Sequence, residues 1–136
     1  MSGGRATLDG ACRCGAVRFR AAVDPATARR CDCSMCRMRG AVAVSCAPDD
    51  FAIREGGDAL RRRTFGTHVA QHWFCGRCGI HTHHRRRADP DELGVNLACL
   101  AGRTPFLPEV IVNDGIHHPS DGAAPRVAGV LRWEPS

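Results

Sequence analysis

Seven of the nine cysteines in this 136-residue chain fall into three short groups, and this grouping constrains the fold more than any other feature. The groups are Cys12-x-Cys14, Cys31-x-Cys33-x-x-Cys36 and Cys75-x-x-Cys78. Nine cysteines cannot all pair within one chain, and the N-terminal residues contain no apolar export segment. We therefore expect a reduced, cytoplasmic protein whose clustered thiols bind metal rather than form disulfides.

Size and composition predict one globular domain over residues 1–136. The hydrophobic content of 43% is typical of globular proteins, and no stretch approaches the roughly 20 apolar residues that a membrane span needs. The formal net charge of +5 suggests nucleic acid as a partner. Two Zn²⁺ ions held by seven thiolates, however, would lower this charge to about +2, which argues against that partner.

Short segments of alternating apolar and polar residues, separated by glycine and proline, predict an all-β fold. In residues 16–23 the side chains of Val17, Phe19 and Ala21 share one face, while arginines occupy the other. Further strands are expected over residues 41–46, 51–53, 60–65, 68–74, 95–99, 110–112 and 130–133. The sequence thus predicts short antiparallel strands held together by metal.

Few segments have the features of a helix. Single helical turns are expected near Ser34 and near Asp91, and residues 113–126 are expected to form a loop. Two arginine clusters remain, at residues 61–63 and 85–87. We interpret the first as an edge strand, where charge discourages aggregation, and the second as a solvated loop.

The segment Cys75-Gly76-Arg77-Cys78-Gly79 has the spacing of a zinc knuckle, in which two thiolates reach one tetrahedral ion. A knuckle supplies two ligands and needs two more. Cys12-x-Cys14 is a natural partner, because the i, i+2 spacing of an extended turn points both sulfurs the same way. Together they predict a closed, structural Cys₄ site. The alternative pairs Cys12 and Cys14 with the Cys31 group.

Cys31, Cys33 and Cys36 predict a different kind of site. Catalytic zinc commonly keeps three protein ligands and leaves one position open for water or substrate. The alternative is a histidine that closes the shell as Cys₃His. The candidates are His68, His72, His81, His83 and His84.

Four motifs occur in a fixed order along the chain. They are Gly10-x-Cys12-x-Cys14-Gly15-x-Val17, Cys31-x-Cys33-Ser34-x-Cys36-Arg37, Phe74-Cys75-x-x-Cys78-Gly79, and Gly94-Val95-Asn96 with Cys99-Leu100. Over about residues 8–113 they resemble the glutathione-dependent formaldehyde-activating enzymes, whose domain is shared by centromere protein V. The tail Asn113-Asp114-Gly115-x-His117-His118-Pro119, followed by Gly129-x-Leu131, resembles one branch of this family.

The resemblance implies a tented fold of several small antiparallel sheets, similar to that of methionine-R-sulfoxide reductases. It also implies two zinc ions per chain, one structural and one catalytic. The structural ion is assigned to Cys12, Cys14, Cys75 and Cys78, and the catalytic ion to Cys31, Cys33 and Cys36, with the fourth position free for a thiol. After the knuckle, however, Ile80-His81-Thr82-His83-His84 and three arginines replace the family's aromatic-rich stretch.

The expected function is that of a zinc-dependent carbon–sulfur lyase/synthase, which adds glutathione to an aldehyde such as formaldehyde. Open zinc lowers the pKa of a bound thiol from about 8.5 and so provides a thiolate nucleophile. Arg37, His72 and Asn96 are the candidate substrate-binding residues. Arg37 would pair with a glutathione carboxylate, and His72 or His81 would donate a proton to the alkoxide.

The alternative function is a non-catalytic zinc-binding module for nucleic acid or protein. It rests on the arginine clusters and on the centromere relative. In both cases we expect no membrane association, and a homodimer is one assembly that the sequence allows.

Overall fold

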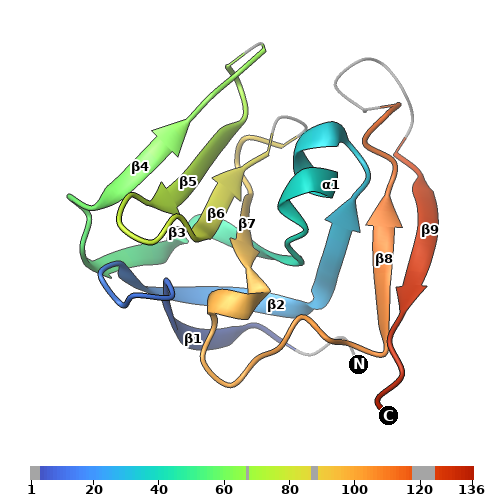
Figure 1. The fold of residues 1–136 in the computed structure, drawn as a ribbon, viewed down its shortest axis with the longest axis horizontal. Helices are drawn as coiled ribbons and strands as arrows, with labels where there is room; N and C mark the ends of the chain where they lie inside the picture. Colours follow the sequence, from blue (N-terminus) through green and yellow to red (C-terminus); the bar gives the residue numbers. More distant parts are fainter. Residues whose placement is uncertain (1–3, 67, 87–88, 118–124) are drawn as a thin grey trace.

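The computed structural model describes residues 4–66, 68–86, 89–117 and 125–136, and nine strands in this part of the chain form one sheet (Figure 1). The strands are β1 (Ala6–Ala11), β2 (Arg18–Cys31), β3 (Ala43–Glu55), β4 (Leu60–Arg63), β5 (Gln71–Cys75), β6 (His81–Arg85), β7 (Leu93–Asn96), β8 (Glu109–Asn113) and β9 (Val127–Arg132). The helices are α1 (Ser34–Arg39) and the 3-10 helix η1 (Leu97–Cys99). The prediction of an all-β fold is confirmed.

The sheet has the order β4-β5-β6-β7-β3-β2-β8-β9, and β1 pairs with β2 outside this path. The long strands β2 and β3 contain register shifts. They pair with each other and with strands on either side, and so join the short antiparallel strands expected from the sequence into one sheet. One described pair is parallel, between β2 and β8, from Arg29↔Ile111 to Cys31↔Asn113. Among the described pairs this one departs from the antiparallel expectation, and the long stretch of chain between β2 and β8 supplies the crossover connection that a parallel pair needs.

The main core lies on one face of the central strands. Phe19, Ala21 and Val23 of β2 are at most 1% exposed, as the alternation of residues 16–23 predicts. They pack with apolar side chains on or next to β3, β7 and β8, namely Val42, Val44, Cys46, Val95, Leu97 and Val110. A Cβ atom at Gly10 would lie 2.3 Å from the Phe19 ring, so only glycine allows β1 to cross this side chain.

A second, much smaller core surrounds the first cysteine pair and the knuckle. It consists of Cys12, Val17, Ala59 and Cys75. The apolar contacts that join these two loops are therefore few, and a shared metal ion would add the main link between them.

Several expected elements differ from the structure. Residues 51–53 are part of the continuous strand β3, and the segment near Asp91 is a turn rather than a helix. Residues 95–99 are not one strand, because the Asn96 side chain accepts a hydrogen bond from the backbone N–H of Ala98 at 3.2 Å and starts helix η1. The sequence also gave no signal for β1 or β6.

The second arginine cluster is not the solvated loop that the sequence predicted: Arg85 ends strand β6, and Arg86 is half-buried and pairs with Glu92. Two other expectations concern the edge of the sheet and the loop after β8. Strand β4 ends the sheet and carries the exposed arginines 61–63, as an edge strand should. The expected loop over residues 113–126 is described only at its two ends, since residues 118–124 lie outside the described part, as does Arg87 of the second arginine cluster. In the described part, helices long and apolar enough to cross a membrane are absent.

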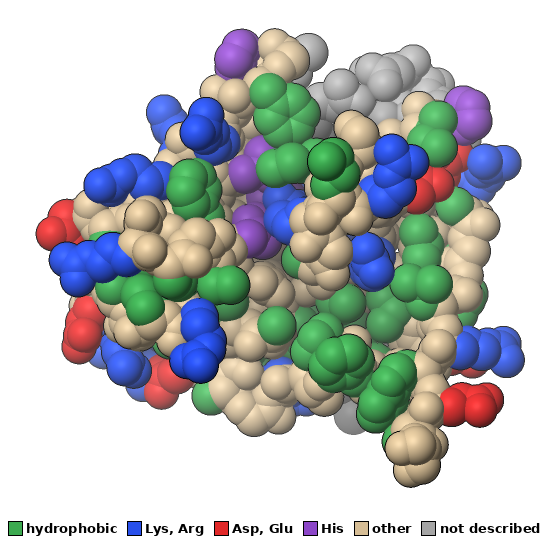
Figure 2. Space-filling model, viewed as in Figure 1, with side chains coloured by type: hydrophobic (Ala, Val, Ile, Leu, Met, Phe, Trp, Pro, Cys, Tyr) green, Lys and Arg blue, Asp and Glu red, His purple; other side chains and the backbone are tan. Residues whose placement is uncertain are grey.

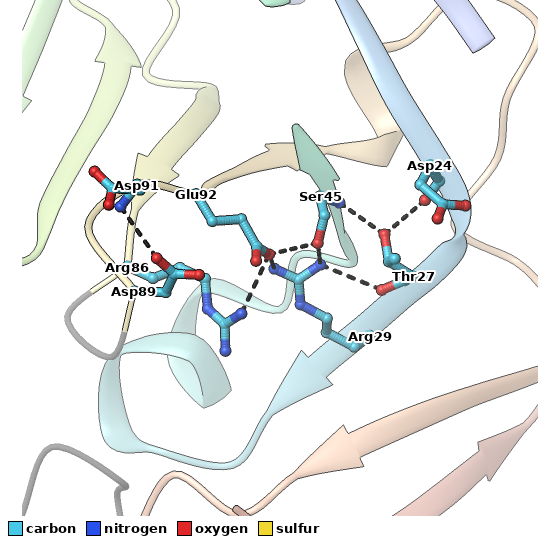
Figure 3. A network of polar contacts seen from close by, with 8 residues as sticks. All are labelled: Asp24, Thr27, Arg29, Ser45, Arg86, Asp89, Asp91 and Glu92. Carbon is cyan, nitrogen blue, oxygen red and sulfur yellow. Dashed lines mark hydrogen bonds and ion pairs between the residues drawn. The ribbon is translucent and has the colours of Figure 1, made fainter. Parts of the chain in front are cut away.

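A partly buried ionic network links β2, β3 and the segment before β7 (Figure 3). The Glu92 carboxylate pairs with Arg29 at 3.1 Å and with Arg86 at 3.2 Å, and it also accepts a hydrogen bond from Ser45. The side chains of Arg29 and Glu92 are only 12% and 26% exposed. Burial alone would raise the pKa of Glu92, but the Ser45 hydroxyl and the two arginines outweigh it and hold this pKa below its usual value.

We expect Glu92→Gln to lower the free energy of unfolding by about 2–3 kcal/mol at pH 7, because it leaves the buried Arg29 without a counter-charge. Since the folded pKa of Glu92 is lowered, its contribution is complete above the usual value of 4.5 and is lost as the pH falls through the folded pKa. The difference in free energy of unfolding between wild type and variant should thus become smaller in acid. Urea unfolding of both proteins at several pH values measures this difference.

The matched control is Glu109→Gln, which breaks the exposed pair with Arg132 at 3.6 Å. Such a pair contributes about 0.5 kcal/mol or less. Equal stability of the Glu92 and Glu109 variants would show that the partly buried network does not stabilise the fold.

Candidate metal centre and substrate cavity

The structure brings the first cysteine pair to the knuckle. The sulfur atoms of Cys12, Cys14, Cys75 and Cys78 all lie within 4.8 Å of one another. Strand β5 ends at Cys75, and the knuckle turns back through Gly79, whose φ of +80° favours glycine. The structure therefore contradicts the alternative in which Cys12 and Cys14 share a metal ion with the Cys31 group.

The geometry of this four-cysteine group fits zinc. Tetrahedral ligands with Zn–S bonds of about 2.3 Å have sulfurs about 3.8 Å apart, and the Cys12–Cys14 and Cys14–Cys75 sulfur distances are 3.6 and 3.8 Å. These separations are far longer than a disulfide bond. The backbone N–H groups of Val17 and Arg77 donate to the sulfurs of Cys12 and Cys75, each at 3.3 Å. Burial alone would raise the pKa of Cys12, but the Val17 N–H and the neighbouring thiols outweigh it and lower this pKa.

The second group lies where β2 meets α1. The sulfurs of Cys31, Cys33 and Cys36 lie within 4.8 Å of one another. Cys33 caps the N-terminus of α1, where its sulfur accepts the backbone N–H of Cys36 at 3.4 Å, and the Cys31 sulfur accepts the N–H of Cys33 at 3.4 Å. Among the residues that the structure describes, which include all five candidate histidines, no fourth ligand joins this group.

The segment after β8 packs closely against this group. A Cβ atom at Gly115 would lie 2.2 Å from the Cys31 sulfur, so only glycine fits there. The Gly115 backbone N–H donates to Asp32 at 2.7 Å. Asp114 is buried and accepts the backbone N–H groups of His117 and Ile116, and its pKa is lowered to about 2 by these bonds and by Arg126. Residues 113–115 of the tail motif therefore lie against the three-cysteine group.

A cavity of about 350 Å³ opens beside the three-cysteine group, large enough for a small organic ligand. Its walls come from α1, from strands β2, β3, β5, β6 and β7, from the segment between β4 and β5 and from the residues after β8. Figure 2 shows histidine and arginine side chains together in a hollow of this face. The polar and charged lining includes Arg29, Arg30, Arg39, His72, His81, His84, Arg86, Asn96, Asp114 and Arg126.

A family model of the glutathione-dependent formaldehyde-activating enzyme matches residues 7–114, which contain all seven clustered cysteines. The chain belongs to this family. A crystal structure of a Rhodobacter sphaeroides protein is 48% identical to it in sequence and has a TM-score of 0.69. That similarity covers 71% of this chain and 91% of the other. The resemblance inferred from the motifs is thus confirmed.

In this family member the three candidate substrate-binding residues have different surroundings. His72 and Asn96 line the cavity, and the Asn96 side chain donates to the backbone oxygen of His81 at 2.8 Å. Arg37 is exposed and does not line the cavity. Arg39 does, with its guanidinium 3.5 Å from the Cys36 sulfur. Arg39 follows Cys36 by three residues, and this spacing on a helix could have predicted their contact from the sequence.

The histidines near the site are neutral at pH 7. Burial lowers the pKa of His72 to about 4, that of His81 to about 2 and that of His83 to about 3. His83 has a structural role, because its ring packs against Phe51 and Trp73 with centroids 4.2 and 4.6 Å away. The two candidate proton donors, His72 and His81, both line the cavity and can therefore reach a ligand.

Proposed function

We propose that this chain is a zinc-dependent carbon–sulfur lyase/synthase of the cytoplasm, which adds glutathione to formaldehyde or a related aldehyde. The observation that carries this proposal is the three-sulfur group at the wall of a cavity, with no fourth ligand among the described residues. The description of the family names both glutathione and formaldehyde. We assign a structural ion to the four-cysteine group and a catalytic ion to the three-cysteine group.

A zinc ion held by Cys31, Cys33 and Cys36 would lower the pKa of a bound thiol and hold it as a thiolate. The protein supplies the rest of the environment. Backbone N–H groups hold two of the three sulfurs, and the Arg39 guanidinium lies against the third and offsets its negative charge. Addition of a thiolate to a carbonyl transfers no electrons between redox partners, which suits redox-inert zinc.

Arg30 is the cavity arginine best placed to bind a carboxylate of glutathione. Arg29 and Arg86 are paired with Glu92, and Arg126 is paired with Asp114. Arg39 is engaged with His72 and the Cys36 sulfur. Arg30 lines the cavity and has no acidic partner among the described residues. We therefore assign to Arg30 the role that the sequence suggested for Arg37.

We expect Arg30→Gln to raise KM for glutathione about tenfold, the effect of losing one charge-assisted hydrogen bond. The kcat value should change little, because Arg30 holds a part of the substrate that does not react. Arg37→Gln removes the same charge outside the cavity and should leave both constants unchanged. Steady-state kinetics with varied glutathione distinguishes the residues, and an effect of Arg37→Gln alone would restore the original assignment.

Assay of the zinc-loaded protein with glutathione and formaldehyde tests the proposed function. NMR exchange spectroscopy should show adduct formation faster than the spontaneous reaction, in proportion to the protein added. Fully metal-loaded protein that gives no acceleration would contradict the proposal. DNA affinity with a steep salt dependence, roughly −0.9 per phosphate on a log–log scale, would then favour the binding-module alternative.

A further inference from the structure

The ring of His72 is fixed in the wall of the cavity. His72 as a whole is only 6% exposed. The ring stacks on Phe65 with centroids 5.4 Å apart and on His84 with centroids 5.7 Å apart. The same cavity is lined by Cys31, Cys33 and Cys36. His72 is therefore a rigid group facing the space beside the proposed catalytic site.

The neighbouring arginine decides which nitrogen of His72 carries the proton. Arg39 Nη1 lies 2.8 Å from His72 Nδ1. A guanidinium can only donate hydrogen bonds, so Nδ1 must be the acceptor. The imidazole is then neutral and its proton is on Nε2. Burial and the Arg39 charge lower the pKa of His72 to about 4, in agreement with a neutral ring.

The resulting Nε2–H group has no partner. Nε2 of His72 is buried and makes no hydrogen bond to any described residue, and Nε of Arg39 is in the same situation. Buried donors without acceptors are rare in folded proteins because they cost free energy. In a cavity wall, such a donor indicates that a ligand supplies the acceptor.

Arg39 also ties this donor to the cysteine group. Its Nη2 lies 3.5 Å from the Cys36 sulfur, while Nη1 contacts His72. One planar guanidinium therefore fixes both the tautomer of His72 and the position of the ring relative to the sulfurs.

We propose that His72 is a catalytic residue whose Nε2–H donates a hydrogen bond to the aldehyde oxygen, and that Arg39 is the positioning residue that holds this tautomer. The inference rests on the proposed function. The thiolate electron pair forms the C–S bond, and the π electrons of the C=O bond move to oxygen. The alkoxide then takes a proton from water, which balances the proton released when the thiol ionised. His72 keeps its own proton throughout and stabilises the developing charge.

Two substitutions at His72 test this role. His72→Phe keeps an aromatic ring for stacking but removes the donor, and we expect kcat to fall about 100-fold. KM for glutathione and the zinc content should stay unchanged. His72→Gln places an amide N–H near the position of Nε2 and should recover about tenfold of the lost kcat. If the wild type is active and the kcat of His72→Phe lies within threefold of the wild-type value, this inference is overturned while the proposed function stands.

A second readout does not depend on activity. In zinc-loaded wild type with ¹⁵N-labelled histidine, NMR should show His72 as the neutral tautomer protonated on Nε2. Arg39→Met should lose this fixed tautomer. A proton on Nδ1, or on both nitrogens, in the wild type at pH 7 would overturn the inference even if the His72 variants fail to fold. A wild type that does not accelerate the addition would overturn the proposed function and this inference together.

Discussion

In the variant Cys75→Ser we expect loss of the ion from the four-cysteine group and loss of most of the folded structure at room temperature. Cys75 is fully buried and lies in the small core that joins the Cys12 loop to the knuckle. Structural zinc contributes roughly 10–16 kcal/mol in zinc-finger peptides, whereas a domain is stable by only about 5–15 kcal/mol. Loss of the ion therefore exceeds what the few apolar contacts can offset. Circular dichroism and metal analysis measure the two effects.

Cys99→Ser is the matched control for this variant. Cys99 is partly buried beside the main core and belongs to neither cysteine group. We expect it to keep both ions and a cooperative thermal transition, with a decrease in Tm of a few degrees. A Cys75→Ser protein with the Tm and zinc content of the wild type would show that the four-cysteine group does not hold a structural ion.

Cys33→Ser should have the opposite pattern, with a folded protein that has lost about one zinc ion and nearly all thiol-dependent addition. The four-cysteine group is not altered by this change. Serine is also a good N-cap residue, so the hydrogen bond from the Cys36 backbone N–H to residue 33 can be kept and α1 can still form. Two remaining thiolates bind zinc only weakly. We therefore expect activity below about 1% of wild type.

Metal analysis, Tm and the NMR assay on the same Cys33→Ser preparation check this expectation. Cys99→Ser again serves as the control that keeps both ions and activity. Full activity in Cys33→Ser would rule out the three-cysteine group as the catalytic site, and global unfolding would show that this group is structural.

The sequence was most informative where the chemistry is local. The spacing of Cys75 and Cys78 and that of Cys31, Cys33 and Cys36 predicted both sulfur groups, because ligands to one ion must lie close together. The partnership of Cys12 and Cys14 with the knuckle also agrees with the structure. Ser34 marked the position of α1 to within one residue, since the N-cap is Cys33.

The features that the sequence did not reveal depend on contacts between distant residues. Strand β6 has no apolar alternation, because its buried side chains are Thr82 and His83, whose environment comes from other strands. The parallel pairing of β2 with β8 brings Gly115 against Cys31, and no local pattern encodes this approach. Arg37 stood out because it follows a ligand directly, whereas the turn of α1 places Arg39 against Cys36.

Zinc-edge X-ray absorption of the wild-type protein, with and without glutathione, tests the central claim most directly. Two ions on four and three cysteines give an average of about 3.5 sulfur ligands per zinc, and a bound thiolate should raise this average to about 4. The Cys33→Ser protein should show no such change. A spectrum that glutathione does not alter, with a complete Cys₃His shell already present at the second ion, would contradict the open catalytic site.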